Sequence, residues 1–233
     1  RVTVYLDYDE LPLPGPSSIE TVRFTSLSSF IVITGLSFSD AASDASFSSA
    51  WDPLSSTAYW SQAFAPFAVA KFLVGTNARA GSYTNPASAA FWALVMTGDS
   101  LYAMGTVAKI VVIDKTTMTE TTSISISYQA SLAVVDDSGP GSVFYSDYDG
   151  SGNYRLLKAT VSPYSLVAQA TLNGPAYNLL AIPSSNLLLL TTAVSSFLQM
   201  FTKDTLNAIS LNFGSISLTS SYFPYIGTVG LMI

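Results

Sequence analysis

The stretch NGPAYNLLAIPSSNLLLLTT, residues 173–192, contains two short apolar runs separated by the turn Pro-Ser-Ser-Asn. Proline and its polar neighbours interrupt a regular element, and apolar runs of this length between turn residues are typical of β-strands. Neither run shows the spacing of an amphipathic helix. The stretch therefore predicts two β-strands joined by a tight turn.

The same pattern returns along the chain at a nearly constant interval. The second strand of each unit is found in STAYWSQ, DSLYAMG, GSVFYSD and SNLLLLT. A third apolar run follows each of these segments, and a fourth is clear in three of the units. Four strands per unit predict an all-β fold of the β-propeller type. The repeat is anchored on Tyr59, Tyr102, Tyr145 and Leu189, with spacings of 43, 43 and 44 residues, and a further 43 residues lead to Met232.

Five anchors in 233 residues predict one β-propeller domain, residues 1–233, with five four-stranded blades. The C-terminal segment SYFPYIGTVGLMI predicts two inner strands of a composite closing blade. The N-terminal segment RVTVYLDYDELPLPGPSSIETVRFTS predicts its two outer strands. Joining both termini in one blade would remove the unpaired edges of an open array. Residues 29–47 fall outside the repeat, and we expect an extra strand over Phe30–Gly35 followed by a loop.

A resemblance to a known family supports the same fold. Residues 173–192, continued by FLQMFTKDTLNAISLNFG, are similar to the YVTN-type repeat of surface-layer β-propellers. That repeat combines a Gly and Pro, an apolar strand, a proline-led turn, a second strand and an Asp/Thr turn. AKIVVIDKTTMTETTSISIS and AWDPLSSTAYWSQ resemble parts of it, so the similarity extends over residues 50–214. It implies a fold rather than an activity, because propellers host many functions.

Composition excludes several classes of function. Nine basic residues and a net charge of −6 argue against a nucleic-acid-binding surface, which requires clustered Lys and Arg. The chain has no Cys and no His, which removes thiolate nucleophiles, structural zinc sites and the commonest general base. The longest apolar run is broken at PSSN and is too short for a membrane span.

One loop has the spacing of a cation site. The segment DYDGSGNY, residues 147–154, places oxygen-bearing side chains at alternate positions, and calcium is bound by six to eight oxygen ligands. Two carboxylates give a weak Ca²⁺ site, and no other cofactor is expected. The alternative, which we favour, is a Gly-rich hairpin turn whose Asp and Asn cap their own backbone. The candidate calcium ligands are Asp147, Asp149, Ser151 and Asn153.

Catalytic groups are sparse. The predicted inner strands lack carboxylates, whereas propeller glycosidases need a pair near the central channel. Asp136 and Asp137 stand beside a Gly-Pro turn, which favours a solvated loop. We therefore expect a protein that is not an enzyme. Several aromatic residues are candidates for stacking on sugar rings, although core packing is the simpler expectation for them: Trp51, Trp60, Trp92, Tyr59 and Tyr102.

The leading functional hypothesis is an extracellular or cell-surface structural module, a subunit of a surface assembly or filament. A carbohydrate- or ligand-binding propeller is the alternative, and a degenerate glycoside-hydrolase-like propeller is third. The chain begins at Arg1, as expected after removal of a signal peptide, and its many hydroxyls allow O-glycosylation. Low charge and high apolar content predict self-association through segments outside the repeat: Leu11, Pro12, Leu13, Pro14, Phe30, Ile31, Val32, Ile33, Leu231, Met232 and Ile233.

Overall fold

The structure is a computed structural model, and nine segments of the chain are described. In the first three segments and at residues 46–47 the structure describes the backbone alone. The described residues are 2–8, 18–26, 29–33, 46–62, 65–73, 78–136, 141–182, 185–192 and 199–209. In this part of the chain, no helix is long and apolar enough to cross a membrane.

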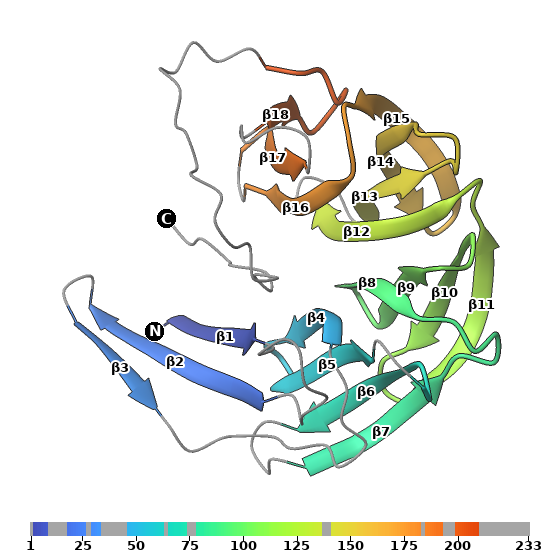
Figure 1. Ribbon diagram of the computed structural model, residues 1–233. Coiled ribbons are helices and arrows are strands. Elements are labelled where there is room, and N and C mark those ends of the chain that lie inside the picture. The colour runs from blue at the N-terminus through green and yellow to red at the C-terminus, as the bar shows by residue number, and fades with distance from the viewer. Residues whose placement is uncertain are drawn as a thin grey trace.

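The fold is an all-β propeller, as the repeat predicts. Four antiparallel sheets follow one another in an arc, and the first strand of each sheet lies on the inner side (Figure 1). The first blade contains β4 (Ser46–Asp52), β5 (Thr57–Gln62), β6 (Ala68–Leu73) and β7 (Ala78–Thr84). The second contains β8 (Phe91–Thr97), β9 (Ser100–Gly105), β10 (Lys109–Asp114) and β11 (Thr119–Ser125).

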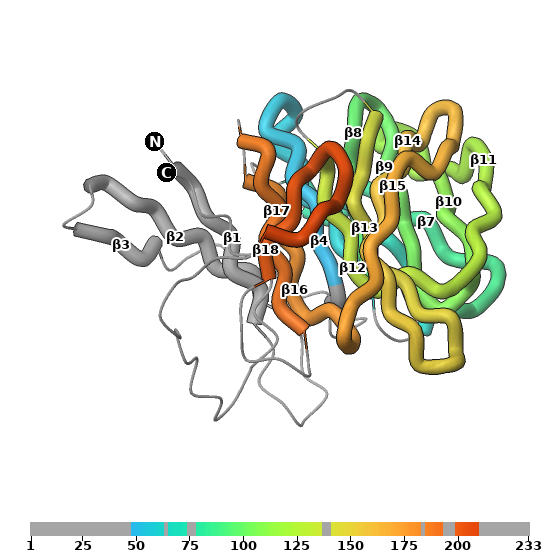
Figure 2. Tube along the Cα trace, turned by 90° about the horizontal axis from the view of Figure 1, so that it is seen from above, coloured from blue at the N-terminus to red at the C-terminus, as the bar shows by residue number. Residues whose placement is uncertain are grey.

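The third blade is built in the same way, and the fourth has three described strands. In both views the fourth blade lies beside the third (Figure 1, Figure 2). The third blade contains β12 (Gln129–Asp136), β13 (Ser142–Tyr148), β14 (Tyr154–Val161) and β15 (Tyr164–Leu172). The fourth contains β16 (Ala176–Ala181), β17 (Leu187–Thr192) and β18 (Gln199–Thr202).

The expected number of five blades is wrong, because the part of the chain that the structure describes forms four. The N-terminal strands pair with one another in the order β1-β2-β3, so they form a three-stranded sheet of their own. The C-terminal half of the predicted closing blade, including Met232, lies outside the described residues, so the composite blade stays a prediction. The strands of this sheet are β1 (Val2–Tyr8), β2 (Ser18–Ser26) and β3 (Ser29–Ile33), the last of which overlaps the extra strand expected at 30–35.

Apolar side chains from adjacent blades form three cores. Alternate residues of a strand point to opposite faces of its sheet, so each second strand serves two blade interfaces. In β9, Leu101 and Ala103 pack toward the first blade, whereas Tyr102 and Met104 pack toward the third. Phe144 of β13 packs in the core shared by the third and fourth blades. Blade-to-blade packing is therefore the main source of apolar burial.

The anchor residues lie on the second strands, with one shift of register. Tyr59 and Tyr102 both pack toward the following blade, but Tyr145 packs toward the preceding one. The ladders show the shift: the second strands begin at Thr57, Ser100 and Ser142, so the first two are 43 residues apart but the next two only 42. Phe144, two positions after Ser142, is the structural equivalent of Tyr59, two positions after Thr57.

A β-bulge recurs in the outermost strand of each complete blade. Ladder pairing skips one residue in β7, β11 and β15, opposite equivalent places in the third strands. A bulge adds twist and reverses which face the following side chains occupy. In β15 it directs Tyr164 toward the second blade and Ala168 toward the fourth. The bulged residues are Ala80, Thr121 and Val167.

Candidate functional site

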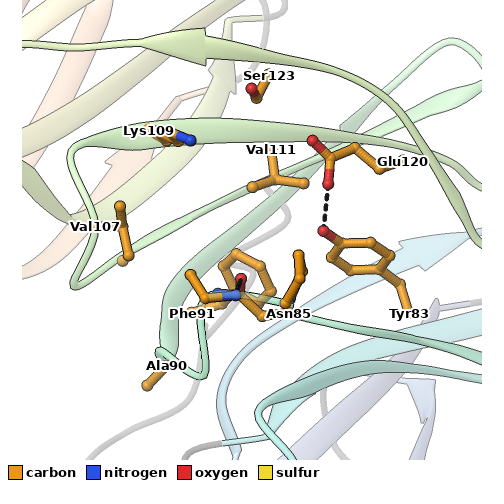
Figure 3. Close-up of a pocket in the computed structure, with 12 residues that line it drawn as sticks. Tyr83, Asn85, Ala90, Phe91, Val107, Lys109, Val111, Glu120 and Ser123 are labelled. Atoms are coloured by element: carbon orange, nitrogen blue, oxygen red, sulfur yellow. Dashed lines mark hydrogen bonds between the residues drawn. The ribbon is translucent and has the colours of Figure 1, made fainter.

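A pocket opens at the seam between the first and second blades. Its volume is about 70 Å³, and it lies where the loop after β7 meets the turn between β9 and β10 (Figure 3). Phe91, Val107 and Val111 give it apolar walls. Tyr83, Lys109 and Glu120 bring polar groups to it from β7, β10 and β11.

The loop that forms one side of the pocket is fixed by Asn85. This buried side chain donates a hydrogen bond from Nδ2 to the Ala89 carbonyl (2.6 Å), and its Oδ1 accepts one from the Ala87 N–H (3.0 Å). Gly105 is required at the other side, because a Cβ there would lie 2.0 Å from the Ala90 carbonyl oxygen. The pocket wall is therefore preorganised by backbone contacts.

Glu120 is already engaged inside the pocket. The Tyr83 hydroxyl donates a hydrogen bond to its Oε2 across the seam (Figure 3). Burial, and then the hydrogen bond to Glu120, raise the pKa of the Tyr83 phenol well above its ordinary value. A neutral phenol held on a carboxylate joins the blades. The acid of the pocket is thus occupied by a contact between the two blades.

The structure separates the two carboxylates of the candidate calcium loop. Asp147 is buried at the end of β13, where both its oxygens face the Arg155 guanidinium, with Nε to Oδ1 at 2.8 Å. Arg155 also lies over the ring of Tyr128, 4.7 Å from its centroid. A bidentate contact of this kind orients both partners. Asp147 therefore links β13 to β14.

Asp149 instead organises the turn. Its Oδ1 accepts hydrogen bonds from the backbone N–H groups of Ser151 (2.8 Å) and Asn153 (3.1 Å). Its Oδ2 accepts one from Asn153 Nδ2 at 2.6 Å. The side-chain bond from Asn153, with the backbone bonds, lowers the pKa of Asp149. This is the self-capped hairpin geometry, and among the residues that the structure describes no three His, Cys, Asp or Glu side chains gather in a group that could hold a metal ion.

A buried ion pair joins the first two blades at another point. Asp52, at the end of β4, accepts a contact from Lys115 Nζ at 3.0 Å, and Asp99 lies 3.4 Å from the same nitrogen. Burial raises the pKa of Asp52, but hydrogen bonds from Lys115, Ser55 and the Leu54 N–H outweigh it and lower the pKa overall. The backbone carbonyl of Lys115 in turn accepts hydrogen bonds from two side chains of the first blade, the Tyr59 hydroxyl and Lys71 Nζ. No pattern in the sequence singled out Asp52, so sequence reasoning missed this role.

Most of the candidate sugar-stacking residues lie in the core. Tyr59, Trp60 and Tyr102 are buried, and the ring of Trp60 stacks on Phe72 with 3.5 Å between centroids. Trp51 and Trp92 are half-buried. Asp136 is also buried and pairs with Lys158 at 2.8 Å, while Asp137 lies outside the described residues.

Sequence reasoning also missed a second recurrent bulge, on the innermost strands. Ladder pairing skips one residue near the start of each first strand. The innermost strands are neighbours around the inside of the arc. Tyr177 at this position is 53% exposed, and Trp92 is half-buried. The spacing of these residues is irregular, so no sequence period reveals them: Phe47, Trp92, Ser131 and Tyr177.

The predicted interface segments cannot be placed as surfaces. Residues 11–14 and 231–233 lie outside the described residues. Residues 30–33 belong to β3, whose backbone pairs with β2. Their side chains are not described, so the predicted role of these segments stays a prediction.

Comparison with known proteins supports the fold. No protein-family model matches the sequence, and no curated protein matches it either. The resemblance to the YVTN repeat therefore stays a prediction. The structure is similar to the WD40 domain of Toxoplasma gondii coronin (TM-score 0.64, 12% identity, 84% of this chain and 54% of that one). It is also similar to U3-55K (TM-score 0.58, 11% identity, 70% of this chain and 50% of that one). The chain thus spans about half the length of these structures.

Proposed function

We propose that this propeller is a non-catalytic protein-interaction module, and that it serves as a structural subunit of an extracellular surface assembly or filament. One observation carries the non-catalytic part of the proposal: every carboxylate whose side chain the structure describes is engaged in an ion pair or a hydrogen bond. Acid–base catalysis needs carboxylates that face a substrate. The engaged residues are Asp52, Asp99, Asp114, Asp136, Asp147, Asp149, Asp204 and Glu120.

Surface chemistry supports association with other copies of the chain. Only 10% of the residues are charged, so little electrostatic repulsion opposes contacts between apolar groups. Exposed apolar side chains that gather on a surface often mark interfaces. Among the described residues, the large apolar side chains that are exposed are Leu54, Leu73, Tyr148, Leu166, Val167 and Tyr177.

Sedimentation velocity over a wide concentration range tests the proposal. We expect the purified chain to form dimers and larger species as its concentration rises, and electron microscopy of the concentrated sample to show regular contacts between copies. A chain that sediments as a monomer at every concentration would overturn the structural-subunit proposal.

A second candidate function, carbohydrate binding, has its own observation. The bulges of the innermost strands put an exposed Tyr177 and a half-buried Trp92 at the same position of different blades. Aromatic faces at one mouth of a propeller are suited to stacking on sugars. A glycan array separates the two functions. Specific binding that is lost in Tyr177→Ala supports the carbohydrate site, whereas absence of binding to any glycan rejects that site and favours the protein-interaction module.

A further inference from the structure

The outermost strand of the third blade differs from its counterparts in charge. β15 has no charged residue in its nine positions, whereas β7 contains Arg79 and β11 contains Glu120. Natural proteins protect exposed sheet edges with charges, prolines or bulges, because an unpaired edge is a template for another strand. In the described sheet β15 is the last strand, so one of its edges has no described partner. Charge does not protect that edge.

The bulge in β15 protects only part of the strand's exposed edge. Val167 interrupts the ladder, but the five residues that follow, Ala168–Leu172, pair regularly with residues 154–158 of β14. Leu166 and Val167 beside them are 47% and 52% exposed. A regular, uncharged edge segment next to exposed apolar side chains is the surface expected for strand addition.

Electrostatics favours a second copy as the occupant of this edge. Each copy has few charged residues but a net charge of −6, so a weak repulsion between two copies remains. The repulsion is smallest where local charge is neutral. In the third blade, Arg155 pairs with Asp147 and Lys158 pairs with Asp136, so the two cations of β14, the strand next to β15, are neutralised by acids of β13 and β12.

The sequence of the edge segment is self-complementary. In an antiparallel pair centred on Ala170, Gln169 faces Thr171 of the second copy, and Ala168 faces its Leu172. Polar side chains then meet polar ones and apolar side chains meet apolar ones on both faces of the pair. Two-fold symmetry makes the same contact twice, as in an isologous dimer.

We propose that β15 pairs with β15 of a second copy, antiparallel and about a two-fold axis through Ala170, to form a continuous eight-stranded sheet from two third blades. The inference rests on the self-association proposed above and names the surface responsible. Each partner supplies backbone N–H and C=O groups to the new ladder, which is the β-augmentation mode of recognition.

Charged substitutions at two exposed positions of β15 test the pairing. Gln169→Lys with Thr171→Lys puts lysine opposite lysine twice in the two-fold register, and we expect the dimer dissociation constant from sedimentation velocity to rise by about tenfold or more. Gln169→Lys with Thr171→Glu puts lysine opposite glutamate twice, and we expect dimerisation to return. The matched control is Ser82→Lys with Thr84→Lys, at the same offsets after the bulge of β7, where both side chains are also exposed.

The outcomes are distinguishable. Weakening by the double lysine, recovery by the charge-swapped variant and no effect of the control support the pairing. A wild-type chain that stays monomeric overturns both this inference and the proposed function. Self-association that all three variants leave unchanged, or that the charge-swapped variant does not restore, overturns the pairing through β15 alone.

Discussion

Asp52 illustrates how a single side chain joins two blades. It ends the first strand of blade one, fixes its own turn through the Leu54 N–H (3.0 Å), and holds Lys115 of blade two (3.0 Å). Its side chain is 3% exposed, so water screens the pair weakly. The exposed Asp99 contacts the same ammonium group from solvent.

Replacing these two aspartates should have very different effects. We expect Asp52→Ala to lower the free energy of unfolding by about 3 kcal/mol, because it leaves Lys115 without its buried partner. Asp99→Ala should leave it nearly unchanged, since exposed pairs contribute little. Urea unfolding of the two variants measures both values. Equal losses would show that the seam does not depend on Asp52.

The lowered pKa of Asp52 also sets a pH dependence. A carboxyl group whose pKa is lower in the folded chain than its ordinary 3.8 stabilises the fold above that value. Its contribution is lost as the pH falls through the folded pKa, when the carboxylate is protonated. We therefore expect stability to fall below about pH 4, and to fall less steeply in Asp52→Ala. If the free energy of unfolding fell equally steeply with decreasing pH in both proteins, the assignment to Asp52 would be contradicted.

At the scale of the elements, the loop at residues 147–154 combines two roles. Asp147 lies on β13 and forms an ion pair with Arg155 of β14, while Asp149 caps the turn between them. The alternation of oxygens in the sequence suggested a shared ligand. It could not show that a strand ends between the two carboxylates, because that depends on pairing with β14.

The two aspartates of this loop should respond unequally to substitution. We expect Asp147→Asn to lower stability by about 3 kcal/mol, because the Arg155 charge loses its buried partner. The matched change Asp149→Asn should have a small effect. Melting temperatures measured with calcium and with a chelator should be the same for the wild type. A rise with calcium that Asp149→Asn abolishes would restore the metal site.

Position 105, at the end of β9, must be glycine because the backbone of Ala90 lies against it. We expect Gly105→Ala to lower the free energy of unfolding by about 3 kcal/mol, because the new methyl group would overlap the Ala90 carbonyl oxygen in the neighbouring strand region. Gly81→Ala is the control, since its methyl group would meet only the flexible Met118 side chain at 3.2 Å. Similar losses for both variants, measured by thermal unfolding, would contradict the close approach.

Strand order within a blade was predictable from the sequence, but blade register was only partly so. The 43-residue period identified the second strands that contain Tyr59, Tyr102 and Leu189. It misaligned Tyr145 by one position, because β9 and β13 begin only 42 residues apart and loop lengths vary without changing the apolar pattern. The bulges also escaped detection, because a bulge depends on how a strand pairs with its neighbour.

At the scale of the whole molecule, the number of blades and the pocket were beyond the sequence. Strand-like segments at the N-terminus were identified, but the structure pairs β1 with β2 and β2 with β3 in a separate sheet. A local pattern indicates that a strand exists and leaves open which strands it joins. The pocket likewise arises where two blades meet, and Tyr83 and Glu120, which bond across it, are 37 residues apart in the chain.

Amide hydrogen exchange in dilute and concentrated solution tests most directly whether this propeller acts through contacts between copies. We expect strong protection of the central strands β9 and β13 at both concentrations. We also expect the amides of β15 to become protected only when the protein is concentrated, whereas the protection of β7 should not change. Exchange in β15 that is independent of concentration would contradict this expectation.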